Sequence, residues 1–154
     1  MPLVVAGPDA RERLIDTPGI YVGRFPIPAL FRVVGHTAVA ESTGGAILVT
    51  ELVGLWQHLF QQIQLHKPQP HYGDFHDYRW VRVADAADIV AFRAATVRAR
   101  DAYHGRVYTA SSNRFVSTVL RHANIEMTRE MLAALGSSPG IRWRQRRLIW
   151  RPSA

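Results

Sequence analysis

Three side chains of the types used in acyl-transfer chemistry are spread along the sequence, namely His36, Glu51 and Ser112. His36 lies inside a β-branched stretch that predicts a strand, where an ionisable ring is unusual. Glu51 ends the next predicted strand, and Ser112 begins an amphipathic helix. Free N–H groups and the positive dipole end at a helix start can hold an oxyanion, while an imidazole takes the proton of the nucleophile and a carboxylate orients the imidazole. The residue types and their order therefore predict an acyl-transfer site.

Each of the three residues also has a structural interpretation. Serine is a preferred N-cap, so Ser112 could serve only to begin its helix. His36 could be a hydrogen-bonded core histidine, and Glu51 could be the solvated end of a strand. The ordered occurrence of all three in one chain favours the site over the separate structural roles.

Hydrophobic periodicity predicts the elements that would position these residues. The predicted strands are residues 19–25, 31–40, 45–51 and 77–83, with a last one in the tail at 140–152. The second and third of these are expected to pair as a hairpin through the turn ESTGG. In the fourth, Tyr78 and Trp80 alternate with Val81 and Val83.

The predicted helices are residues 52–64, 85–104 with Asp85 as N-cap, 111–123, and 127–135, which Gly136 ends. Strands and helices are mixed without a regular βαβ alternation, so the expected fold class is α+β, a small antiparallel sheet packed against helices. The length and the 47% hydrophobic content are those of a single domain, residues 1–154.

The stretch GHTAVAESTGGAILVTELVGLWQHLFQQIQ resembles the circularly permuted papain-like hydrolases, the NlpC-type and YiiX-like group that includes lecithin retinol acyltransferase. Members show a small residue and then His in a strand, a turn, a strand that ends in a polar or Glu residue, and a helix. A Tyr-rich approach later leads to a Cys that opens a helix, with a hydrophobic pair three and four residues on. YHGRVYTASSNRFVSTVL matches that approach, and the resemblance covers roughly residues 19–122.

The resemblance implies a permuted papain-like fold, with His36 as the base, Glu51 or else Thr50 as the orienting group, and Ser112 at the position of the catalytic cysteine. It also implies an amidase or acyl hydrolase that acts on bacterial cell-wall peptides or lipid esters. Serine departs from the family, because a thiol with an ordinary pKa near ~8.5 is readily held as a thiolate and a hydroxyl is not. Three interpretations follow: a deliberate Cys-to-Ser replacement, which fits a chain with no cysteine, a natural serine enzyme, and a natural pseudoenzyme.

The charge of the chain favours anionic partners. Lys and Arg number 19 against 12 Asp and Glu, a formal net charge of +7. The arginines and tryptophans of the tail suit phosphate contacts, but no nucleic-acid-binding motif accompanies them, so nucleic acid is not the expected partner. The alternative to an enzyme is a non-catalytic module of the same fold that recognises an anionic lipid, polymer or protein. An antibacterial effector with an inhibitor or immunity protein is one setting for such a domain.

Other classes of site and location are not expected. The absence of cysteine excludes disulfides and thiolate metal sites. His66, His71 and His76 recur near Asp74 and Asp77, but their spacing is no known ligand pattern, so we expect neither a metal nor a cofactor. The sequence has no apolar run of membrane-spanning length and no signal-peptide pattern, which predicts a cytoplasmic chain or one exported by a non-Sec route.

Overall fold

The structure is a computed structural model, and it describes residues 1–26, 35–55, 60–103 and 112–136. The predicted strand in the tail at 140–152 lies outside the described residues, as do residues 31–34 of the predicted strand 31–40. Within the described part of the chain, no helix is long and apolar enough to cross a membrane.

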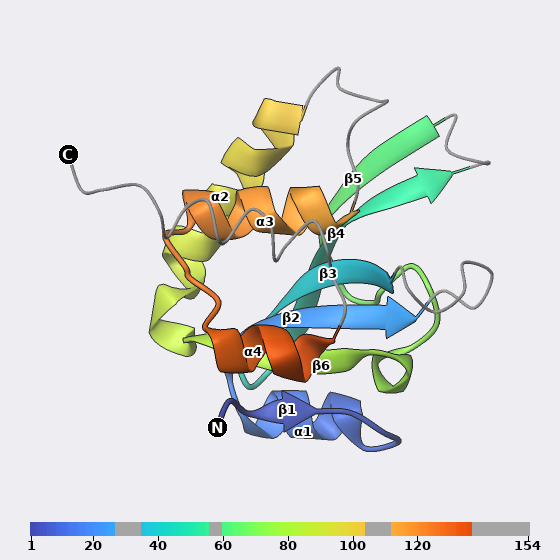
Figure 1. Ribbon diagram of the computed structural model, residues 1–154, viewed down its shortest axis with the longest axis vertical. Coiled ribbons are helices and arrows are strands. Elements are labelled where there is room, and N and C mark those ends of the chain that lie inside the picture. Colours follow the sequence, from blue (N-terminus) through green and yellow to red (C-terminus); the bar gives the residue numbers. More distant parts are fainter. Residues whose placement is uncertain (27–34, 56–59, 104–111, 137–154) are drawn as a thin grey trace.

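The described strands form one six-stranded sheet in which every neighbouring pair is antiparallel. Its strand order is β1-β6-β2-β3-β4-β5 (Figure 1). The strands are β1 (Val4–Val5), β2 (Gly19–Pro26), β3 (Gly35–Ser42), β4 (Ile47–Leu55), β5 (Phe60–Lys67) and β6 (Arg79–Asp85). Strands at 19–25, 45–51 and 77–83 are confirmed, and so is the hairpin of β3 with β4.

The helices of the described residues are α1 (Ala10–Asp16), α2 (Ile89–Tyr103), α3 (Ser112–His122) and α4 (Arg129–Leu135), with short 3₁₀ turns η2 (Phe75–Asp77) and η3 (Ala86–Asp88). Figure 1 shows α4 lying across β2 and β6, and α3 beginning beside β4. The α+β class with an antiparallel sheet is therefore confirmed, and β1 and α1 are elements that the sequence did not predict.

Side-chain alternation along the strands divides the core between the two faces of the sheet. The face under α2, α3 and α4 is made by Ile20, Val22, Val39, Leu52, Val81 and Val83, which pack against Phe92, Phe115, Val116, Val119 and Leu120. The opposite face is made by Tyr21, Ala38, Ala40, Val49 and Trp80, which pack against Leu14 of α1 and Phe75 of η2. The predicted alternation of Trp80 with Val81 and Val83 is thus confirmed.

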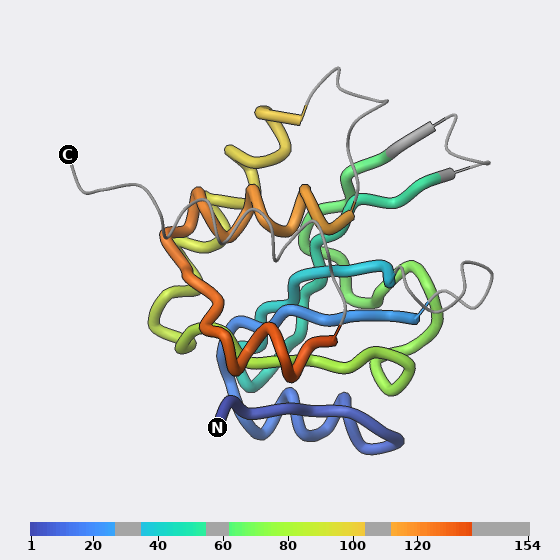
Figure 2. The backbone as a smooth tube through the Cα atoms, viewed as in Figure 1, coloured from blue at the N-terminus to red at the C-terminus, as the bar shows by residue number. Residues whose placement is uncertain are grey.

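The predicted helix at 52–64 is wrong. β4 continues to Leu55, and β5 begins at Phe60 and runs back beside it. Figure 2 shows the two strands side by side. Leu52 lies opposite Ile63 across this hairpin, and both contact the core under the helices. Helix propensity is a weak preference, and cross-strand pairing combined with burial on the sheet overrides it here.

The three other predicted helices are confirmed, with one correction at a terminus. Asp85 precedes η3 and α2, but its side chain makes no capping hydrogen bond and instead pairs with Arg82 at 3.1 Å. Thr128 does cap α4, because its hydroxyl accepts a hydrogen bond from the N–H of Met131 at 3.2 Å. Gly136, with φ 97, follows the last turn of α4 as predicted.

Candidate active site

The candidate site lies where β3 and β4 diverge. The β3–β4 ladder runs from the pair Ser42–Ile47 to the pair Val39–Thr50, and beyond Thr50 the ladder of β4 continues with β5 alone. The first residues of β3 are therefore paired with β2 on one side only. Main-chain groups on the open side need other partners, since unpaired buried backbone groups are costly.

Ser112, the first residue of α3, supplies one of those partners. Its Oγ accepts a hydrogen bond of 3.3 Å from the main-chain N–H of Thr37. The Thr37 hydroxyl in turn donates to Oδ1 of Asn113 at 2.8 Å, and both of these residues are buried. The start of α3 is thereby fixed against β3 at the residue that follows His36. The hydrogen bonds of the described residues do not join Ser112 to the His36 ring.

His36 and Glu51 lie together on the face of the sheet opposite α3. Nε2 of His36 is 3.6 Å from Oε1 of Glu51, and the two side chains are only 4% and 0% exposed. This distance is longer than a hydrogen bond, and the two groups form an ion pair when the ring is protonated. Neither Nε2 of His36 nor Oε2 of Glu51 has a hydrogen-bond partner among the described residues. The structure thus brings together the predicted base and its predicted orienting group.

Glu51 is held as an anion by its neighbours. Nζ of Lys67 is 3.2 Å from Oε1, and the main-chain N–H of His71 donates to the same oxygen at 2.9 Å. Burial by itself raises the pKa of the Glu51 carboxyl, but the His36 ring, the Lys67 ammonium and the His71 N–H outweigh burial, so its pKa lies below the ordinary value.

Thr50, the alternative orienting group, has a different role. Its Oγ1 accepts a hydrogen bond of 3.0 Å from the main-chain N–H of His66. Thr50 also lies opposite Val39, whose side chain packs under the helices, so its own side chain projects from the face away from the His36 ring. Glu51 is therefore the better candidate of the two.

Sequence reasoning missed Lys67 and Tyr72. The Tyr72 ring meets the His36 ring edge-on, with centroids 4.6 Å apart, and its hydroxyl donates to the carbonyl of Gly54 at 3.3 Å. Burial, with a contribution from the Glu51 charge, raises the pKa of Tyr72. Lys67 carries a signal that could have drawn attention, because it is the single lysine of the chain.

The histidines considered for metal binding do not gather into one cluster. Asp74, His76 and Asp77 offer ligand-type atoms within 4.8 Å of one another, and all three are exposed. The Asp77 carboxylate accepts the main-chain N–H of Asp74 at 2.8 Å, which accounts for part of this arrangement as the local structure of η2. His66 is engaged elsewhere, with Nε2 2.8 Å from the hydroxyl of Thr96 on α2.

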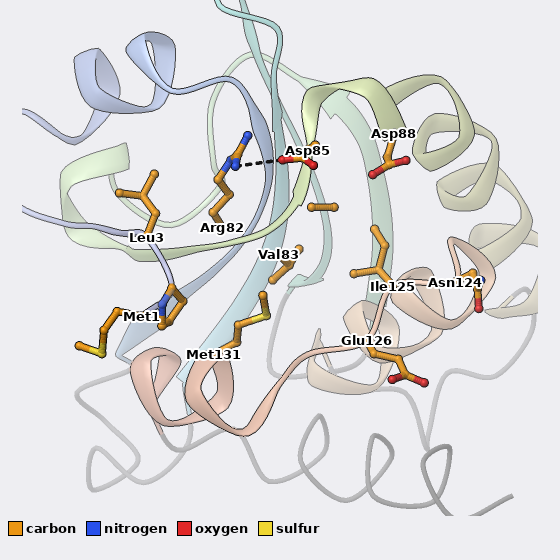
Figure 3. Close-up of a pocket in the computed structure, with 12 residues that line it drawn as sticks. Met1, Leu3, Arg82, Val83, Asp85, Asp88, Asn124, Ile125, Glu126 and Met131 are labelled. Atoms are coloured by element: carbon orange, nitrogen blue, oxygen red, sulfur yellow. Dashed lines mark ion pairs between the residues drawn. The ribbon is translucent and has the colours of Figure 1, made fainter. Parts of the chain in front are cut away.

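Two cavities lined by described residues lie away from the candidate site. The larger, of about 630 Å³, is between β6, the chain start and the segment before α4. Figure 3 shows Val83, Ile125 and Met131 in its lining together with the carboxylates of Asp85 and Glu126. A smaller cavity of about 330 Å³ lies between α1 and residues 68–76.

Comparisons with protein-family models, with curated proteins and with solved structures found no match. The resemblance to papain-like hydrolases therefore stays a prediction from the motifs, and any assignment of function rests on the residues at the divergence of β3 and β4.

Proposed function

We propose that the chain is an acyl-transfer hydrolase, an amidase or acyl hydrolase of the permuted papain-like kind. The observation that supports it is the meeting of three distant segments at one point of the sheet. His36 and Glu51 form a buried pair, and Ser112 is hydrogen-bonded to the main chain one residue from the base.

In the proposed reaction, the side chain at position 112 attacks the carbonyl carbon of an amide or ester. Nε2 of His36 faces Glu51, and in the proposed reaction Nδ1 takes the proton of the nucleophile. His36 then returns that proton to the leaving amine or alkoxide as the carbon–heteroatom bond breaks. Water, deprotonated by the same ring, releases the acyl group from position 112. The first N–H groups of α3 have no partner within the helix and can stabilise the oxyanion.

The nucleophilic group at position 112 determines the rate expected for this reaction. The imidazole must remove the proton of a serine hydroxyl during attack, whereas a thiol can be ionised beforehand by an imidazolium and a helix N-terminus. Replacement of Ser112 by cysteine is therefore expected to raise the activity of the chain. This holds whether the serine is an engineered replacement, the native residue of an enzyme or that of a pseudoenzyme.

The substrates proposed are bacterial cell-wall peptides or lipid esters. A formal net charge of +7 favours anionic polymers and lipid surfaces as the setting of such bonds. Action as an antibacterial effector, with an inhibitor or immunity protein as partner, is compatible with this substrate class.

A specific observation favours a second candidate, a non-catalytic module of the same fold that binds an anionic lipid, polymer or protein. Oγ of Ser112 already accepts a hydrogen bond from the main-chain N–H of Thr37. Among the described residues, it makes no hydrogen bond to the His36 ring. A serine with only this role would fix α3 to β3.

The discriminating experiment incubates the parent and the Ser112→Cys variant with peptidoglycan fragments and with phospholipid vesicles, followed by mass spectrometry of the products. Cleavage by Ser112→Cys, reduced about 100-fold or more when His36→Ala is added, supports the enzyme. Ser112→Ala is the matched inactive control. Absence of cleavage on every substrate, with binding retained, supports the module instead.

A further inference from the structure

Lys67 is the last residue of β5, and its ammonium points at the buried pair of His36 and Glu51. Nζ lies 3.2 Å from Oε1 of Glu51, and the side chain is only 19% exposed although β5 is an edge strand. The ammonium also donates to the side-chain oxygen of Gln64. A lysine on an edge strand usually projects into solvent, where it discourages edge-to-edge pairing. This lysine is directed inward.

An irregularity of β5 directs it there. Gln64 lies opposite Glu51, and in a regular antiparallel ladder Lys67 would then lie opposite Leu48, on the other face of the sheet. The register shifts between Val49 and Glu51, so that Lys67 lies opposite Val49 and shares the face of Glu51. One extra residue of β5 is accommodated in this stretch.

His66 makes the irregularity possible. Its φ of 49 places it in the left-handed region, which is disfavoured for a residue with a side chain. Two hydrogen bonds hold it in this conformation, from its N–H to the Thr50 hydroxyl at 3.0 Å and between its ring and the Thr96 hydroxyl at 2.8 Å. A disfavoured backbone conformation is thus maintained beside the one lysine that reaches Glu51.

Within the part of the chain that the structure describes, the titratable side chains around Glu51 come from β3, β5 and the segment before β6. They are His36, Lys67, His71, Tyr72 and Tyr78. The tyrosines are neutral at pH 7, since burial raises the pKa of both. His71 contributes its main-chain N–H, and the His36 ring carries charge only when protonated. Within this set, Lys67 is the cation whose charge does not depend on a histidine proton.

We propose that Lys67 is a positioning residue, which supplies the counter-charge of Glu51 so that His36 can remain uncharged and act as a base. A buried carboxylate without a cation is strongly destabilised. If His36 were the only counter-charge, the ionised Glu51 would require a protonated His36 ring. An imidazolium has no lone pair with which to accept a proton, so the ring could not act as a base. The role as a base rests on the proposed function, whereas the pairing of Lys67 with Glu51 does not.

The test measures the ionisation of Glu51 by ¹³C NMR of the side-chain carboxyl groups, with the Glu51 resonance identified by its absence in Glu51→Gln. In Lys67→Met, the titration midpoint of Glu51 is expected to rise by about one pH unit or more, a tenfold change in the ionisation ratio. Lys67→Arg, which restores the charge, is expected to return it to near the parent value. Gln62→Met, at an exposed position of the same strand, is the matched control. An unchanged midpoint in Lys67→Met overturns the proposal.

The pairing of Lys67 with Glu51 can also be tested if Lys67→Met fails to fold. If the unpaired Glu51 carboxylate is the cause, Lys67→Met combined with Glu51→Gln is expected to fold, because the buried charge is then absent. Failure of this double variant to fold, while Glu51→Gln alone folds, contradicts the proposal.

The same variants in the Ser112→Cys background separate this inference from the proposed function. Lys67→Met is expected to move the acid limb of the pH–rate profile to higher pH, with rescue by Lys67→Arg. If the Glu51 midpoint rises but no variant cleaves any substrate, the proposed function fails and the pairing stands. If substrate is cleaved but neither the profile nor the Glu51 midpoint responds, the positioning role fails and the proposed function stands.

Discussion

The Ser112 hydroxyl accepts a hydrogen bond of 3.3 Å from the main-chain N–H of Thr37, the residue that follows His36. This contact joins the beginning of α3 to β3 at the point where β4 has left the ladder. It therefore connects two segments separated by 75 positions, and it fixes position 112 against the residue that follows the predicted base in the sequence.

The buried hydrogen bond between Thr37 and Asn113 is expected to stabilise the packing of α3 against β3. Asn113→Ala leaves the Thr37 hydroxyl without its acceptor, and we expect a loss of about 1–3 kcal/mol in the free energy of unfolding. Thr37→Val removes the donor instead. Because the two side chains interact, the double variant is expected to lose less than the sum of the single losses. Urea denaturation of the four proteins measures this, and strict additivity would show that the pair is not coupled.

Glu51 is expected to make the protein sensitive to acid. Its pKa in the folded state is below the ordinary value of about 4.5, so its stabilising contribution is complete above that value and is lost as the pH falls through the folded-state pKa. The free energy of unfolding of the parent should therefore fall more steeply below about pH 4.5 than that of Glu51→Gln. Urea titrations between pH 7 and pH 3 measure the slopes, with the exposed Glu130→Gln as control. Equal slopes in Glu51→Gln and the parent contradict the assignment.

Because β2 packs closely against β6, alanine is expected to destabilise the protein at one glycine and not at another. A Cβ at Gly23 would overlap the ring of the fully buried Trp80, whereas a Cβ at Gly45 meets nothing within 4 Å. Gly23→Ala is expected to destabilise the protein by about 1–3 kcal/mol through overpacking, and Gly45→Ala is expected to stay within about 0.5 kcal/mol of the parent. Thermal denaturation compares the two, and similar melting temperatures would rule out this packing of Trp80.

The strongest local patterns predicted the fold where they agreed with tertiary packing. The strand at 77–83 was predictable because Trp80 alternates with Val81 and Val83, and α2 and α3 because their apolar residues recur at helical spacing. The segment 52–64 failed because Leu52 and Ile63 fit either a helix stripe or a cross-strand pair, and only the position of β4 in the sheet decides between them. β1, with two residues, is too short to carry a periodic signal, and α1 buries only Ala10 and Leu14.

The candidate site was predictable in part. The proximity of His36 and Glu51 follows from a hairpin that the sequence indicates, since both residues lie on its two strands. The contribution of Lys67 does not follow, because it depends on a register shift and on the positive φ of His66. Local sequence patterns do not specify such an irregularity, which results from side-chain hydrogen bonds to Thr50 and Thr96 in other elements.

The most direct test of the proposed site is the reactivity of the thiol in Ser112→Cys, which is the only thiol in the chain because the parent has no cysteine. The rate of alkylation by iodoacetamide is measured from pH 4 to pH 10, with and without His36→Ala. We predict a midpoint well below the ordinary thiol pKa of ~8.5, and its return towards that value when His36 is removed. A midpoint near ~8.5 that is the same with and without His36 would contradict the assignment of His36 and position 112 to one active site.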